Sequence, residues 1–190
     1  MQLSFLQPIC DRIRSLTWNT VTPGYLLAAI LLFFLLLLGG LPLVRRKKLS
    51  ALQLAGICLL VPYLFLVLSG AVFCRRVRKK HSYLLIPFWS YYQAFVLGKK
   101  NYQGYILRNL LMLFPLGLLF PVCSGGREKT GKRLVLLALG ISCGIELMQL
   151  LLKRGTFELV DDPFNNLLGA LLGFLVYKLI RLLLRKKEKQ

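Results

Sequence analysis

The feature that most constrains this chain is a series of apolar runs, each about as long as a lipid bilayer is thick. The first contains the unbroken stretch YLLAAILLFFLLLL. A membrane-spanning helix needs about 20 mainly apolar residues, because each residue adds 1.5 Å to the helix and the hydrocarbon core is about 30 Å thick. Runs that meet or approach this length cover residues 24–44, 49–74, 105–123, 134–152 and 164–184. We therefore predict an all-α integral membrane protein, a bundle of about five transmembrane helices.

The connections between the runs are short, so the chain leaves no room for a separate soluble domain. We expect an N-terminal segment with the first transmembrane helix at 1–48, a helical bundle at 49–184 and a basic tail at 185–190. The one long connection, between helices two and three, contains the aromatic stretch HSYLLIPFWSYYQAFVLGKK. From Tyr83 to Gly98 it has about 16 residues, which suits an interfacial or re-entrant segment better than a span. Its rings fit the head-group region, and an aromatic platform for a sugar or lipid head group is the alternative.

Charge and cysteine content narrow the function classes. The net charge is +19, but the Lys and Arg residues form short blocks between the apolar runs, which is typical of interfacial anchors at anionic lipid. Binding to nucleic acid would need a folded, water-facing basic surface, so we expect no nucleic acid partner. The five cysteines contain no CxxC spacing, so we predict no metal site, and the sequence indicates no cofactor.

The basic blocks do not settle the orientation of the chain. With five spans, the two membrane faces carry nearly equal numbers of Lys and Arg residues. If Tyr83–Gly98 also spanned the membrane, the cations would concentrate on one face, as the positive-inside rule prefers. The six-helix alternative therefore stays open.

Polar residues concentrate where three helices reach the same membrane face. The start of the third helix, the end of the fourth and the start of the fifth must share that face, because successive helices alternate in direction. Glu146 and Gln149 project from one side of the fourth helix, Glu146 about 9 Å below its end. A carboxylate facing lipid at that depth is costly, so we expect Glu146 to turn inward and pair with Arg108, with Asn109 and Gln149 completing the hydrogen bonds. A polar clasp that only fixes helix packing is the alternative to a binding or catalytic pocket. The predicted pocket consists of Arg108, Asn109, Glu146, Gln149, Arg154, Asp161, Asp162 and Asn166.

The start of the fifth helix and its glycines carry further signals. Asp161 and Asp162 precede Pro163, so one of these acids can cap the helix and complement its dipole. The spacings Gly140-x-x-x-Gly144 and Gly169-x-x-x-Gly173 are small-residue faces that allow helices to approach closely. We expect these two faces to bring the fourth and fifth helices together, with homodimerisation through the same faces as the alternative.

Two segments, RNLLMLFPLGLLFP (108–121) and IELMQLLLKRGTFELVDDPFNNLLGALLG (145–173), resemble the VanZ-like membrane proteins. The family pattern is an Asn and a Pro-Leu-Gly in one helix, Glu-x-x-Gln near the end of the next, then Arg, Asp-Asp, Asn and paired glycines. LLIPF (84–88) resembles a further family element, although its leading Asn is absent here. The first helix looks like an addition to the family plan. The matching residues are Asn109, Pro115, Gly117, Glu146, Gln149, Arg154, Asp161, Asp162, Asn166, Gly169 and Gly173.

The resemblance implies a multi-pass protein of the bacterial cytoplasmic membrane, with the polar end facing outward. The founding member of the family is linked to lower susceptibility to teicoplanin, a glycopeptide with an acyl tail. We therefore predict a protein whose polar pocket engages a lipid or lipid-linked envelope component. The alternative is a membrane enzyme that modifies such a lipid with Glu146 or Asp161 as general base. The sequence assigns no catalytic residue and no oligomeric state.

Overall fold

The computed structural model describes residues 21–75, 77, 83–84, 86–126, 129–154, 157–158 and 161–187. The N-terminal residues 1–20 and the last three residues of the predicted basic tail lie outside this part of the chain. Five helices within it are long and apolar enough to cross a membrane, which confirms the predicted all-α bundle. They are α2 (Pro23–Arg45), α3 (Ala51–Leu68) continued by the π-helical turn η1 (Ser69–Phe73), α5 (Lys100–Cys123), α6 (Thr130–Leu151) and α7 (Asp161–Lys187).

The aromatic segment between η1 and α5 does not span the membrane. Within it, the strand β1 (Tyr83–Leu84) is followed by the three-residue helix α4 (Trp89–Tyr91) and the π-helical turn η2 (Tyr92–Val96). We call α4 and η2 together the hook. Elements of three and five residues cannot cross a bilayer. The structure therefore adopts the five-span arrangement and not the six-span alternative.

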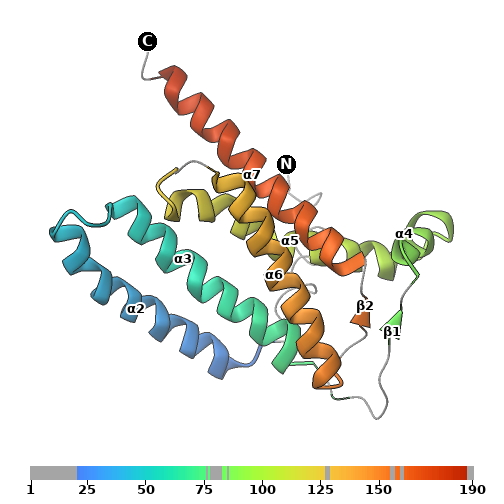
Figure 1. The fold of residues 1–190 in the computed structure, drawn as a ribbon. Coiled ribbons are helices and arrows are strands. Elements are labelled where there is room, and N and C mark those ends of the chain that lie inside the picture. The colour runs from blue at the N-terminus through green and yellow to red at the C-terminus, as the bar shows by residue number, and fades with distance from the viewer. Residues whose placement is uncertain are drawn as a thin grey trace, which may run out of the picture.

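Short backbone pairings tie this segment to the connection between α6 and α7. Strand β1 pairs in parallel with β2 (Phe157–Glu158), and Val77 bridges to Arg154. Figure 1 shows the two strands beside α4, at the end of the bundle away from the C-terminus. We call this the polar end. The opposite end, with the α2–α3 and α5–α6 connections and the last turns of α7, is the basic end.

The closest helix packing in the bundle joins α5 to α7. A Cβ atom added to Gly169 would collide with the carbonyl group of Leu110, and one added to Gly173 with that of Phe114. Gly117 on α5 approaches the Ala170 carbonyl equally closely. Small residues therefore let the two backbones touch, as they do in many membrane bundles.

The predicted meeting of two glycine faces between α6 and α7 is wrong. Gly140 and Gly144 are exposed, and a Cβ atom added to either would meet nothing within 4 Å. The glycine face of α7 turns to α5, whereas α6 packs beside α7 through other side chains, including the buried Ser142 and Ala138. The spacing predicted a close contact for α7 but could not choose its partner.

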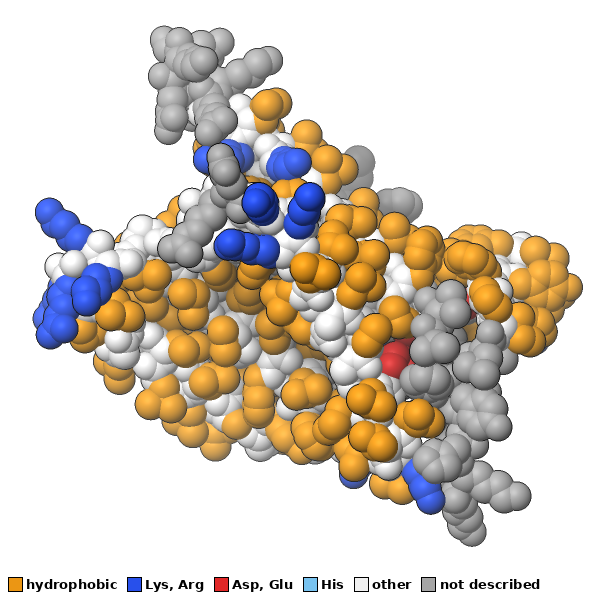
Figure 2. Space-filling view, in the orientation of Figure 1, with side chains coloured by type: hydrophobic (Ala, Val, Ile, Leu, Met, Phe, Trp, Pro, Cys, Tyr) orange, Lys and Arg blue, Asp and Glu red, His pale blue; other side chains and the backbone are white. Residues whose placement is uncertain are grey.

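The outer surface of the bundle is apolar. Large hydrophobic side chains point outward from several helices, for example Leu52, 70% exposed, and Leu136, 71% exposed. Figure 2 shows hydrophobic side chains over most of the visible face, with Lys and Arg gathered toward the basic end. Such a surface is stable against lipid and would be costly in water. The chain is therefore a multi-pass membrane protein.

Candidate functional site

The polar end contains a cluster of polar side chains that are almost completely buried. They come from the hook, α5, α6 and α7, and none is more than 5% exposed. Buried polar groups are costly unless they pair with each other. We call this set the polar cluster: Ser90, Gln93, Asn109, Ser142, Glu146, Gln149, Asp161, Asp162, Asn165 and Asn166.

Asp161, the first residue of α7, holds the hook in place. Its carboxylate accepts hydrogen bonds from the backbone N–H groups of Phe88, at 2.6 Å, and Ser90, at 2.9 Å. The Ser90 hydroxyl donates to the same carboxylate. Phe88 has a left-handed backbone (φ 58°) and precedes α4, so the carboxylate lies at the start of that short helix. Asp161 therefore caps a neighbouring helix, which the sequence did not predict.

Aromatic and amide groups strengthen the same junction. The Tyr91 hydroxyl donates a hydrogen bond to the Asn165 side-chain oxygen. Burial raises the pKa of the Tyr91 phenol, and the negative charge of Asp161 raises it further, so the phenol keeps its proton. The Phe88 and Phe164 rings meet edge to face with centroids 5.6 Å apart. Together these contacts fasten the hook to the first turn of α7.

Asp162 forms the centre of the network. The Tyr105 hydroxyl and the Asn109 amide both donate to one of its oxygens. The Glu146 carboxyl of α6 and the positive charge of Arg75 also act on the Asp162 carboxyl. Asp162 therefore connects α7 with both α5 and α6.

Two arginines connect the cluster to the end of η1. Arg75 donates to the Gln149 side-chain oxygen at 3.2 Å, and the Gln149 amide donates to the Ala71 carbonyl at 3.1 Å. Arg154 donates to the carbonyl oxygens of Val72, Phe73 and Arg75. These are carbonyls that the helix end leaves without intrahelical partners. Both arginines thus satisfy groups that lipid could not.

Arg108 lies outside this network, which corrects our prediction that it is the buried partner of Glu146. Its side chain is exposed, whereas the adjacent Asn109 is buried. Successive residues on a helix point about 100° apart, so the two side chains face different surroundings. Arg75, and not Arg108, supplies positive charge to the carboxyl groups of the network.

The structure brings most of the other predicted pocket residues together. Asn109, Glu146 and Asp162 are linked directly, and Asn166 donates to the Ser142 hydroxyl of α6 at 2.7 Å. Sequence reasoning missed several contributors. Arg75 was hidden in a basic block, and Tyr105 lies one helical turn before Asn109, a spacing that could have revealed it. The contributors absent from the predicted pocket are Arg75, Ser90, Tyr91, Gln93, Tyr105, Ser142 and Asn165.

Three amide atoms of the cluster have no hydrogen-bond partner among the described residues: Gln93 Oε1, Asn165 Nδ2 and Asn166 Oδ1. Each buried, unpaired polar atom costs about 1–3 kcal/mol. The described residues contain no group of three or more His, Cys, Asp or Glu side chains placed to hold a metal ion. The cluster can therefore make further hydrogen bonds near the Glu146 and Asp162 carboxyl groups. Asn165 Nδ2 can donate one, and Gln93 Oε1 and Asn166 Oδ1 can accept them.

Comparison with protein-family models identifies the family of the chain. A family model described as VanZ/LLP1 matches residues 54–181, which include the whole polar cluster and leave out all of α2. No curated protein and no solved structure matches the chain.

Proposed function

The chain belongs to the VanZ/LLP1 family, and from this premise we propose that its polar end engages a lipid or lipid-linked component of the bacterial cell envelope without chemical change. The observation that carries the proposal is that one side-chain amide atom each of Gln93, Asn165 and Asn166 has no hydrogen-bond partner among the described residues. A clasp that served only to pack helices would satisfy its own polar groups, because unpaired ones weaken it. A polar head group would supply the missing partners.

The surface of the hook suits the rest of such a ligand. Phe88 is 50% exposed and contacts Phe164 of α7, and Phe95 is 69% exposed and lies two residues after the buried Gln93. An amphiphile could place its apolar part along these side chains and its polar part against the amides. Asp161 keeps this surface beside the cluster, because it holds the backbone of the hook.

The family resemblance supports a location and a phenotype. We infer that the protein resides in the bacterial cytoplasmic membrane with the polar end facing outward, so that the N-terminus is outside and the C-terminal tail inside. We also infer that it lowers susceptibility to lipoglycopeptides such as teicoplanin.

A susceptibility assay tests this function. Cells that express the protein should tolerate more teicoplanin than cells without it, and Glu146→Gln and Asn165→Ala should abolish the difference at equal protein levels. Arg108→Gln is the matched control, because it removes a charge at the same end of the bundle outside the network. If the wild-type protein changes no susceptibility, the phenotype is wrong. If Glu146→Gln and Asn165→Ala retain it, the cluster is only a clasp.

A second candidate function rests on the neighbouring carboxyl groups of Glu146 and Asp162. Such a pair can donate and accept a proton, as general acid–base catalysis of lipid modification requires. Glu146 is the candidate base because it belongs to this pair, whereas Asp161 accepts hydrogen bonds from Phe88 and Ser90 and holds the hook. Mass spectrometry of lipid extracts decides between the two functions: a new or altered lipid in expressing cells favours the enzyme, and identical extracts exclude it.

A further inference from the structure

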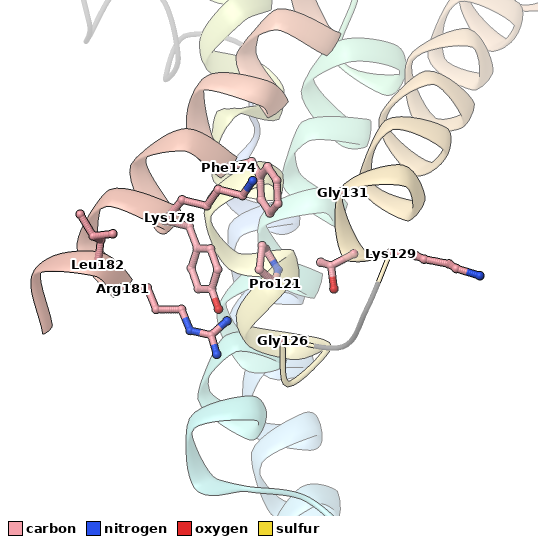
Figure 3. A pocket seen from close by; sticks show the side chains of 10 residues that line it. Pro121, Gly126, Lys129, Gly131, Phe174, Lys178, Arg181 and Leu182 are labelled. Carbon is pink, nitrogen blue, oxygen red and sulfur yellow. The ribbon is translucent and has the colours of Figure 1, made fainter. Parts of the chain in front are cut away.

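A second site lies at the basic end, on the opposite side of the bundle from the polar cluster. A cavity of about 480 Å³ opens between the end of α5, the start of α6 and the last turns of α7. Figure 3 shows it between Pro121 of α5, Gly131 of α6 and the side chains of Phe174, Lys178 and Arg181 of α7. Its volume falls within the usual range of ligand sites.

The polar lining of the cavity is basic. Lys178 places its Nζ 4.8 Å from the centroid of the Phe174 ring, which in turn stacks on Tyr177. In Figure 3 the Arg181 side chain extends toward Gly126, whereas Lys129 points away from the other lining side chains. Among the described residues that line the cavity, none is acidic. The site therefore presents one ammonium and one guanidinium group without a lining carboxylate to neutralise them.

Two glycines keep the space beside these cations open. Gly126 has a left-handed backbone (φ 68°), and a Cβ atom added there would lie 3.2 Å from Arg181 Nη1. A Cβ atom added to Gly131 would lie 3.4 Å from the Phe174 ring. Side chains at either position would reach into the volume that a ligand needs.

The start of α6 adds to the positive potential. Thr130 and Gly131 form its first turn and line the cavity, and this turn contains no acidic residue. The N-terminus of a helix carries a partial positive charge and favours anions. The helix end and the two side-chain cations therefore act on the same space.

We propose that this cavity binds a phosphate group, and that its source is the head group of an anionic phospholipid in the leaflet at the basic end. Arg and Lys together recognise phosphate by charge and by directed hydrogen bonds. The source follows from the flank of the cavity, where α7 continues with Leu179, Leu182 and Leu183, each more than half exposed. An acyl chain can lie along these side chains while the phosphate occupies the cavity. The site is independent of the function proposed for the polar end.

The test uses the full-length protein and phosphatidylglycerol as the probe. Native mass spectrometry of protein released from phosphatidylcholine nanodiscs with increasing phosphatidylglycerol measures how much anionic lipid is retained. The double variant Lys178→Gln/Arg181→Gln should bind at least about tenfold more weakly, because it loses two charged hydrogen-bond donors to the phosphate. The matched control is Arg45→Gln/Arg46→Gln, which removes the same charge from exposed positions at the same end. Equal losses in the two double variants, or no loss in either, would overturn the proposal.

A second variant and a second probe complete the design. Gly131→Leu keeps every charge but fills the cavity, so it should reduce retention while thermal unfolding shows an intact fold. Inorganic phosphate, compared with chloride at equal ionic strength, distinguishes the sources. Stabilisation of the wild-type protein by phosphate alone, lost in Lys178→Gln/Arg181→Gln, would support a phosphate site with a soluble ligand. If neither phosphatidylglycerol nor phosphate depends on these residues, the cavity binds no phosphate.

Discussion

The two ends of the bundle use their charges in opposite ways. At the polar end, Arg154 donates hydrogen bonds to backbone carbonyls, and Asp161 accepts hydrogen bonds from backbone N–H groups. At the basic end, Lys178 and Arg181 remain exposed around an open cavity. The difference teaches that burial decides the role of a charge. A charge surrounded by protein must be paired and then organises the fold, whereas an interfacial charge stays available for ligands.

The largest expected effect is an all-or-none difference in accessibility between the two ends. In a background without the native cysteines, Lys99→Cys lies at the polar end and Lys48→Cys at the basic end, both exposed. A membrane-impermeant maleimide applied to intact cells should label only Lys99→Cys, because the polar end is expected outside. Labelling of Lys48→Cys alone would show that the protein has the opposite orientation. Labelling of both would show that the two ends do not lie on opposite faces of the membrane.

Removal of the Asp161 carboxylate should cause the largest loss of stability. Asp161→Ala leaves the N–H groups of Phe88 and Ser90 without their acceptor, at a cost of about 3 kcal/mol. The hook should then detach from α7. Thermal unfolding in detergent measures the loss, and limited proteolysis near α4 reports the detachment. Asp161→Asn keeps one acceptor oxygen and should lose less; equal stability of Asp161→Ala and wild type would show that the hook needs no carboxylate.

The same substitution, Gly→Ala, should change the free energy of unfolding in opposite directions at Gly169 and Gly144. Gly169→Ala forces α7 away from the Leu110 carbonyl and should cost about 2 kcal/mol by overpacking. Gly144→Ala on α6 meets open space and should stabilise its helix by about 0.5–1 kcal/mol. Thermal unfolding compares them. A loss at Gly144 as large as that at Gly169 would mean that the exposed face of α6 also packs, for example against a second copy.

The smallest expected difference is in the free energy of unfolding when an arginine is replaced by glutamine at each end of the bundle. Arg154→Gln removes donors from the carbonyls at the end of η1 and should cost about 2 kcal/mol. Arg181→Gln changes an exposed side chain and should alter the free energy of unfolding by no more than about 0.5 kcal/mol. Urea unfolding in mixed micelles measures both. Equal effects would show that the guanidinium at the basic end also has a structural role.

The meeting of polar residues at one end was predictable, because helices that alternate in direction bring known ends to one face. Glu146 and Asp162 meet as this reasoning requires, and Asn109 joins them. The prediction that Arg108 faces inward was wrong. Which side of a helix faces the bundle depends on how the helix is rotated about its axis, and neighbouring helices decide that rotation. Arg75 was missed because it lies in a basic block. The sequence of such a block does not show which cation contacts lipid head groups and which one binds inside the protein.

The sequence by itself determined that this chain is a membrane bundle of about five helices, since hydrophobic length against bilayer thickness is a property of each segment alone. It also indicated that polar residues of three helices gather at one end of the bundle. Only the tertiary structure decided that Gly169 packs against α5, that Asp161 holds the hook and that a basic cavity opens at the far end. These three features depend on how each helix is rotated about its axis and on which helices it packs against. In lipid, helix packing depends on close backbone contact and on hydrogen bonds between distant segments.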